Sequence, residues 1–329
     1  MISISGGSAN ELFSAAVHRV LAEGRRVCPR GAETKEILGA PLMLTEPRRR
    51  LVSLAPVRLL NPAFAVAEAV WILSGSDDPW IFDYNTRLAQ FADDGVLRGA
   101  YGPRMRHWGN RVDQLDRVRA LLQEDPDTRR ALIQLYDPAR DTAPNRDIPC
   151  TLNFRFYLRE GRLHMHTTMR SQDLWWGFCY DLFTFTVLHE LMAHWIGAQV
   201  GEYHHHVDSL HLYADHFERA AVLPTDPPLS STSPALAVDW QYFDTTLEQS
   251  RTGTPAAPPG WEAFGMVMQS YRHWKNGNHL RARQVGSQVP GELGACLERW
   301  YEHLTHKAQQ RRNGVDSAPR GSRSVFGNA

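Results

Sequence analysis

The stretch IPCTLNFRFYLREGRLHMHTTMRSQD, residues 148–173, decides the fold class. From residue 151 to residue 158, Leu152, Phe154 and Phe156 alternate with polar side chains, which is typical of a half-buried strand. A charged, glycine-containing turn follows, and a second strand then ends at a polar loop. The stretch therefore predicts a β-hairpin whose open end carries both Cys150 and the MRSQD loop.

Helical patterns surround this hairpin. Ser8 and Glu11 have the spacing of a capping box and predict a helix that ends at Gly24. The pair Asn61-Pro62 predicts a second helix, which Gly75 stops. The other predicted elements are a loop at residues 26–36, a turn at 99–103, helices at 112–122 and 183–196, and a strand at 130–136. This order predicts an α+β fold in which helices back a mixed sheet.

The amino-acid composition of the chain changes after Phe217. Residues 223–234 and 252–260 are rich in Pro, Ser, Thr and Gly and predict loops, whereas 261–274 and 293–304 have helical patterns. The domain organisation predicted is a catalytic core over residues 1–217, a helical part of the same domain over 218–306, and a basic, disordered tail over 307–329.

Composition excludes several classes of protein. The 329 residues hold 36 Lys plus Arg and 36 Asp plus Glu, so the net charge is zero and no long-range attraction to nucleic acid or a membrane surface is expected. No apolar run approaches the roughly 20 residues of a membrane span. The first residues do not resemble a secretory signal, and the four cysteines show no CxxC spacing, so a cytoplasmic location is expected.

Cys150 is the candidate nucleophile. It follows Pro149 at the start of a predicted strand, where a side chain can face a cleft. A thiolate is the strongest common side-chain nucleophile near neutral pH, and a nearby arginine lowers the pKa of a thiol. The alternative is a small buried residue, and Cys28 also has arginines nearby in the sequence.

Charged residues in unusual places are further candidates. Glu68 lies in an apolar helix, where a carboxyl is costly unless it is paired or functional, so proton transfer and a structural ion pair both fit. Arg170 and Ser171 follow a strand and suit a phosphate, as do Arg129 and Arg130. Solvated loops remain the alternative for both pairs.

The run from His204 to His206, with His211 and His216, suggests zinc. Consecutive histidines in an extended segment point to alternating faces and cannot easily share one ion, and no Cys or Glu has a matching spacing. We therefore expect no metal site.

Short motifs in a fixed order give the chain its resemblance to a known family. They are YG at residues 101–102, VDQL at 112–115, DPDTRR at 125–130, IPC at 148–150, MRSQD at 169–173 and HLYADH at 211–216, with AEAVW at 67–71 and PRG at 29–31. Over residues 12–217 the chain resembles the thymidylate synthase family. The resemblance implies the thymidylate synthase fold, a homodimer with packed sheet faces, and 5,10-methylenetetrahydrofolate as co-substrate.

The resemblance also implies roles for single residues. Cys150 corresponds to the nucleophile that adds to C6 of a pyrimidine, Glu68 to the acid/base and Tyr101 to the tyrosine near the C5 proton. The implied nucleotide ligands are Arg30, Arg170 and Ser171 for the phosphate, Arg129 and Arg130 for the phosphate of the neighbouring subunit, and His211 and Tyr213 for the sugar 3′-hydroxyl.

The implied folate contacts follow the MRSQD loop. Asp173 corresponds to the carboxylate that binds the pterin. Trp176 and Gly177 are the further candidates for this subsite, with Trp176 and Trp175 as an apolar wall. Ordinary core packing is an equally good explanation of the two tryptophans.

Asp181 departs from the family pattern in a way that predicts the substrate. It stands where the uracil-specific enzymes carry Asn, and the family's deoxycytidylate hydroxymethylases have Asp. A carboxylate accepts a hydrogen bond from N4 of cytosine but matches O4 of uracil only when protonated. Asp181 therefore favours cytosine, and Arg130 with Ser171 favours the deoxynucleotide, although CMP stays open.

Three other departures favour hydration over methylation. Thr151 stands where methylating enzymes usually have His, Met169 replaces the usual Gln, and the chain after Phe217 does not resemble the tail that keeps water from the folate. We expect a dCMP 5-hydroxymethylase. The alternatives are a CMP-preferring hydroxymethylase of a nucleoside antibiotic pathway, a thymidylate synthase-type methylase of dUMP or dCMP, and a nucleotide- or RNA-binding protein without turnover. The joint presence of Cys150, Glu68 and Asp173 argues against the last.

Overall fold

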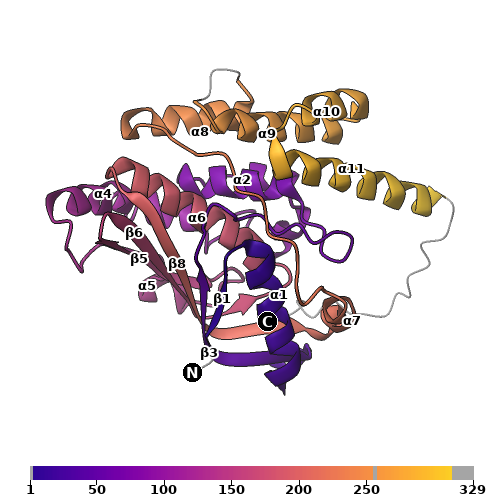
Figure 1. Ribbon diagram of the computed structural model, residues 1–329, viewed down its shortest axis with the longest axis horizontal. Helices are drawn as coiled ribbons and strands as arrows, with labels where there is room; N and C mark the ends of the chain where they lie inside the picture. Colours follow the sequence, from indigo (N-terminus) through magenta and orange to yellow (C-terminus); the bar gives the residue numbers. More distant parts are fainter. Residues whose placement is uncertain (1–2, 255–257, 313–329) are drawn as a thin grey trace.

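The computed structural model describes residues 3–254 and 258–312 (Figure 1). The strands are β1 (Ile4–Gly6), β2 (Arg25–Val27), β3 (Thr34–Leu44), β4 (Leu132–Gln134), β5 (Thr151–Arg159), β6 (Arg162–Met169), β7 (Gln172–Asp173) and β8 (Gln199–Tyr213). The helices are α1 (Ala9–Glu23), α2 (Pro62–Leu73), α3 (Tyr101–Arg106), α4 (Gln114–Glu124), α5 (Pro138–Asp141), α6 (Phe178–Trp195), α7 (Phe217–Ala221), α8 (Phe243–Thr252), α9 (Trp261–Lys275), α10 (His279–Gly286) and α11 (Gly291–Arg312).

One mixed sheet organises the molecule. Its strand order is β1-β3-β8-β6-β5-β4, with β2 paired to β3 and β7 paired to β8. The β5–β6 hairpin is antiparallel, as expected, and β6 runs parallel to β8, which places the end of β6 beside β7 and the second half of β8. The expected α+β fold with a helix-backed mixed sheet is confirmed.

The sheet has one buried face and one half-exposed face. Phe154 and Phe156 on β5 are buried, as their alternation predicts. The ring centroids of Phe154 and of Phe185 on α6 lie 4.8 Å apart in an edge-to-face arrangement. Near the start of β5 a bulge shifts the register, so Thr151 is buried whereas Leu152 is only partly buried. The bulge re-aims the first residue of the strand, next to Cys150.

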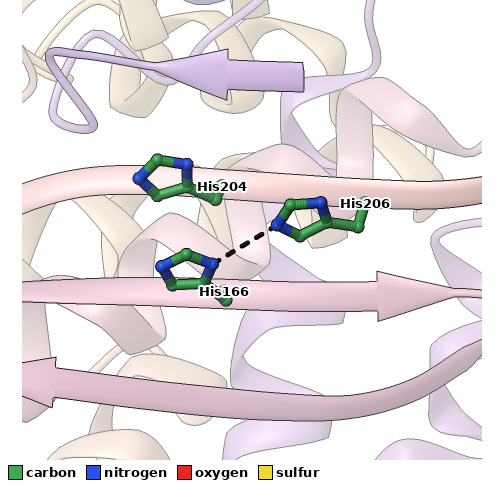
Figure 2. A group of neighbouring side chains, drawn as sticks. All are labelled: His166, His204 and His206. Atoms are coloured by element: carbon green, nitrogen blue, oxygen red, sulfur yellow. Dashed lines mark hydrogen bonds between the residues drawn. The ribbon is translucent and has the colours of Figure 1, made fainter. Parts of the chain in front are cut away.

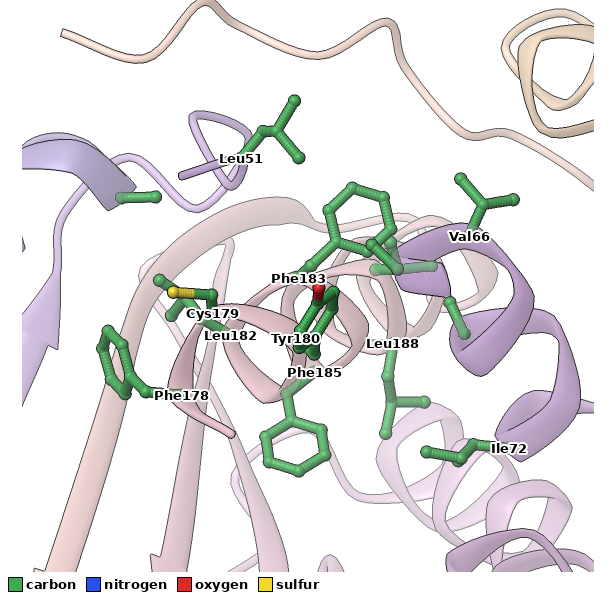
Figure 3. Packing of buried hydrophobic residues seen from close by; sticks show 14 of the residues in the cluster. Leu51, Val66, Ile72, Phe178, Cys179, Tyr180, Leu182, Phe183, Phe185 and Leu188 are labelled. Atoms are coloured by element: carbon green, nitrogen blue, oxygen red, sulfur yellow. The ribbon is translucent and has the colours of Figure 1, made fainter. Parts of the chain in front are cut away.

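Layers of helix follow on the buried face (Figure 1). Helix α6 packs on β6 and β8, and α2 packs on α6. The side chain of Asn61 caps α2 by accepting from the backbone N–H groups of Ala63 and Phe64, and Pro62 occupies its first turn. Almost every residue of α2 is buried, because α6 covers one side of it and α8, α9 and α11 pack against the rest. Figure 3 shows Val66 and Ile72 of α2 beside the side chains of α6.

The C-terminal helices belong to the same hydrophobic core. Helices α8, α9 and α11 pack on the side of α2 that faces away from the sheet. The ring of Phe264 on α9 stacks on that of Phe183 on α6, with ring centroids 5.9 Å apart. Trp195 donates through Nε1 to the carbonyl of Val238 at 2.9 Å. No helix among the described residues has both the length and the apolar character needed to cross a membrane.

Three local predictions are wrong. Residues 26–36 contain the end of β2 and the start of β3 instead of a continuous loop, because Arg25–Val27 pairs with residues 34–36. Of the predicted turn at 99–103, residues 101–103 belong to α3. Helix α11 continues through residues 307–312, which were assigned to the disordered tail. The rest of that tail, 313–329, lies outside the described residues.

Candidate active site

Cys150 and Arg170 meet at the open end of the β5–β6 hairpin. Arg170 donates through Nε to the carbonyl of Pro149 at 2.9 Å and through Nη2 to that of Ile148 at 3.0 Å. These bonds hold the guanidinium so that Nη2 lies 3.7 Å from Sγ of Cys150. Burial raises the pKa of the Cys150 thiol, and Arg170, the next largest influence, lowers it. The arginine therefore favours the thiolate at this position.

Tyr101 is fixed beside the cysteine. It begins α3, and its hydroxyl oxygen accepts a hydrogen bond from the backbone N–H of Thr151 at 3.2 Å. Burial raises the pKa of Tyr101 well above its usual value, and the charges of Asp181 and Cys150 raise it further. The phenol is thus neutral and faces the same group of side chains as Cys150.

Two partly buried carboxyls complete this group. Asp181 lies in the first turn of α6, and burial raises its pKa to about 7. Glu68 lies on α2, and its pKa is raised well above the ordinary value, first by burial and then by the charge of Asp181. Within the described chain, Oε2 of Glu68 is buried without a hydrogen-bond partner. A buried, protonatable carboxyl with an unused oxygen is suited to accepting or donating a proton.

Asp181 is hydrogen-bonded to the first of a series of buried polar side chains that the sequence analysis did not identify. Gln172 donates through Nε2 to Oδ2 of Asp181 at 2.9 Å, and its Oε1 is paired with Nε2 of His205 at 3.0 Å. Nδ1 of His205 in turn lies 2.8 Å from the hydroxyl of Tyr203. Gln172 stands in the quoted MRSQD loop, but its role depends on which strands are neighbours, and the loop sequence alone does not show that.

Arg30 and Tyr213 approach the cysteine from another direction. Arg30 lies in a short 3₁₀ turn, Pro29–Gly31, with a left-handed φ of 52°. Burial raises the pKa of Tyr213, Asp173 raises it further, and a hydrogen bond with Arg30 lowers it. His211 lies on the same strand as Tyr213, with ring centroids 5.3 Å apart. The predicted phosphate and sugar ligands on β8 and the 3₁₀ turn are therefore neighbours.

Asp173 closes the loop before α6. Its Oδ1 accepts from the backbone N–H groups of Trp175 at 2.8 Å and Trp176 at 3.3 Å. Burial raises the pKa of Asp173, and His211 lowers it. Trp175 is buried, whereas Trp176 is 41% exposed with the Arg87 guanidinium 4.3 Å from its ring centroid. Core packing thus explains Trp175 but leaves the Trp176 ring accessible to a ligand.

The remaining predicted residues lie around this group. A Cβ at Gly177 would come 2.7 Å from Nε2 of Gln172, so a larger residue there would displace the amide that donates to Asp181. Ser171 is half-buried directly after β6. Arg129 and Arg130 are exposed between α4 and β4, and no hydrogen bond among the described residues joins them to Cys150.

Asp147 is a further residue that the sequence did not identify. Its carboxylate accepts from the backbone N–H of Gly99 at 2.8 Å and is among the charges that raise the pKa of Cys150. Burial raises the pKa of Asp147 itself. Its position one residue before the IPC motif was the available signal.

A thiol beside a guanidinium, with a neutral tyrosine and two partly buried carboxyls around it, has the groups that covalent catalysis needs. The chain belongs to the thymidylate synthase family: the family's sequence pattern matches residues 11–250.

Three phage proteins are similar to the chain, each named deoxyuridylate hydroxymethyltransferase. That of Bacillus phage SP01 is 40% identical over 231 residues, which are 66% of this chain and 60% of the relative. That of Pseudomonas phage M6 is 34% identical over 169 residues, 50% of this chain and 48% of the relative. That of Delftia phage PhiW-14 is 32% identical over 220 residues, 61% and 60% of the two chains. The chain thus spans 60% or less of the length of these relatives.

Proposed function

We propose that the chain is a 5-hydroxymethylase of pyrimidine nucleoside monophosphates that takes its one-carbon unit from 5,10-methylenetetrahydrofolate. The observation that carries the proposal is the placement of Cys150 against Arg170, with Tyr101, Asp181 and Glu68 in the same partly buried group. The family membership and the names of the similar phage proteins support the same chemistry.

The thiolate of Cys150 adds to C6 of the pyrimidine, and the displaced electron pair makes C5 nucleophilic. C5 then forms a bond to the methylene carbon of the folate as the first of the two bonds from that carbon to folate nitrogens breaks, and the C5 proton leaves to a water molecule beside the Tyr101 hydroxyl. Cleavage of the remaining bond from that carbon to a folate nitrogen releases tetrahydrofolate and leaves an exocyclic methylene group. Water adds to this group, the thiolate departs from C6, and the 5-hydroxymethyl nucleotide results. Glu68 exchanges protons in these steps, because burial and the charge of Asp181 raise its pKa and so favour the protonated carboxyl more than at an exposed site.

The nucleotide is held at its far end. Arg30, Arg170 and Ser171 bind the phosphate, and His211 with Tyr213 binds the sugar. Arg129 and Arg130 are exposed, which suits a contact to the phosphate in a second copy of the chain, so the proposal includes a homodimer. Fixing the remote phosphate positions the ring over the cysteine and lowers the entropic cost of reaction. Asp173, Trp176 and Gly177 form the folate side of the site.

Asp181 is proposed to choose the base, with dCMP as the first candidate. As a carboxylate it accepts from the N4 amino group of cytosine and opposes O4 of uracil. As a neutral acid it offers one donor and one acceptor, which suits either base. With a pKa of about 7 both forms are populated near neutral pH. The names of the phage relatives support dUMP as the second candidate.

A competition assay tests the function. The protein is mixed with methylenetetrahydrofolate and equimolar dCMP, CMP and dUMP, and products are identified by mass spectrometry while dihydrofolate absorbance is followed. A hydroxymethyl nucleotide without dihydrofolate is the expected result, and the ratio of products decides the base and the sugar. A methylated nucleotide with equimolar dihydrofolate would replace the proposal by a methylating synthase.

A further inference from the structure

The outer face of the sheet gathers histidines from two neighbouring strands (Figure 2). β6 and β8 run parallel, with His166 opposite His204 and Thr168 opposite His206. Because side chains alternate along a strand, His204 and His206 share this face while His205 points into the core. The expected alternation is therefore confirmed, but the neighbouring strand supplies a third imidazole that the linear sequence does not reveal.

The three imidazoles are close enough to share one ion. Nδ1 of His166 lies 3.3 Å from Nε2 of His206. Two nitrogens bound to one tetrahedral zinc ion at 2.0–2.1 Å lie roughly 3.3 Å apart, so this pair already has the separation of two ligands. The rings of His204 and His166 are stacked, with centroids 4.2 Å apart. Ligand atoms of all three residues lie within 4.8 Å of one another.

We propose that His166, His204 and His206 bind a divalent transition-metal ion of the zinc type, one ion per chain. Imidazole nitrogen is a preferred ligand of such ions, and three protein ligands leave a fourth position for water. The three residues are partly buried within one chain.

Glu202 orients one of the ligands. Its Oε2 lies 3.3 Å from Nε2 of His204 and 4.0 Å from Nδ1 of His164. A carboxylate on one nitrogen of a histidine fixes the ring and leaves the other nitrogen for the metal. His164, Glu202 and His204 also form a group of possible ligands by themselves, and the two arrangements share only His204.

The test uses the untagged full chain, stripped of metal by a chelator that is then removed. Cobalt(II) chloride is titrated while the visible absorbance of tetrahedral cobalt is recorded, and zinc affinity follows from competition with the bound cobalt. We expect one ion per chain. His166→Gln, His204→Gln and His206→Gln should each weaken binding at least about 10-fold, and Glu202→Gln about 10-fold or less. His164→Gln and the exposed control His306→Gln should leave the affinity within about twofold.

Several results would overturn the site. Unchanged affinity in the three histidine variants would do so, provided that far-ultraviolet circular dichroism shows them folded. Loss of binding in His164→Gln but not in His166→Gln would place the ion in the other arrangement. A ratio of one ion to two chains would exclude a site within one chain. No nucleotide or folate is present in the titration, so its outcome is independent of the proposed hydroxymethylase activity.

Discussion

Three consecutive histidines of β8 show how differently the two faces of one sheet are built. His205 is fully buried and linked through Gln172 to Asp181. His204 and His206 lie partly exposed on the opposite face, beside His166. The same residue type thus supports the candidate active site on the inner face and forms the proposed metal site on the outer face. The difference arises from strand alternation and from which elements cover each face.

The largest effect should come from removing the nucleophile of the inner face. Cys150→Ala is expected to lower turnover by about 10⁴-fold or more, because no other group supplies the bond to C6. Nucleotide binding, measured by calorimetry with dCMP, should change little since the phosphate ligands remain. Cys28→Ala, at an exposed cysteine, is the matched control and should keep activity within about twofold. Turnover that survives in Cys150→Ala would exclude covalent catalysis by this residue.

The next effect concerns the choice of base. Asp181→Asn replaces a carboxyl by an amide, which donates to O4 and accepts from N3–H of uracil. A mismatched hydrogen bond costs ~1–3 kcal/mol, so the ratio of kcat/KM for dCMP over dUMP should fall about 10- to 100-fold. Asp208→Asn, at an exposed position of β8, should leave the ratio unchanged. An unchanged ratio in Asp181→Asn would mean that other residues select the base.

The sequence was sufficient to predict the local elements and most of the candidate site. It was not sufficient to predict the pairing of strands that lie far apart in the sequence. Ser8, Asn61 and the 159–161 turn act through residues a few positions away, so their helices and hairpin were predicted. β3 and most of β8 carry charged, glycine, proline or histidine residues between their apolar positions, which hides the strand pattern. Only pairing over distant residues makes them strands.

The same limit applied to the site. Motifs identified Cys150, Arg170 and Asp181, each of which the structure places in one region. Gln172 and His205 were missed because their contact crosses from the loop after β6 to the middle of β8. The grouping of His166 with His204 and His206 is likewise a property of neighbouring strands, not of spacing in the sequence.

A change of pH should have a smaller effect on the choice of base. Burial raises the pKa of Asp181 to about 7, so the side chain is a neutral acid below that pH and a carboxylate above it. The neutral form suits both bases, and the carboxylate retains only the bond from N4 of cytosine. The ratio of kcat/KM for dCMP over dUMP should therefore rise with pH through about 7. Asp181→Asn should show a flat ratio between roughly pH 6 and 8, and a flat ratio in the unaltered protein would contradict the titration.

The smallest predicted change tests whether the inner-face chain of polar groups tunes Asp181. Gln172 donates to Oδ2 of Asp181 and thereby lowers the pKa of that carboxyl, in opposition to the burial that raises it. Gln172→Met keeps a side chain of similar length but removes the donor, so the pKa of Asp181 should rise. The pH at which the dCMP-to-dUMP ratio changes should then move upward, while turnover at low pH falls only a few-fold because the nucleophile is intact.

Gln199→Met, at an exposed position at the start of β8, is the control for this variant and should leave the midpoint in place. A purely structural role for Gln172 would lower activity at every pH without moving the midpoint. A midpoint that stays fixed, or that moves to lower pH, would therefore separate His205 and Gln172 from the chemistry of Asp181. The buried histidine of β8 would then differ from its two neighbours in packing alone.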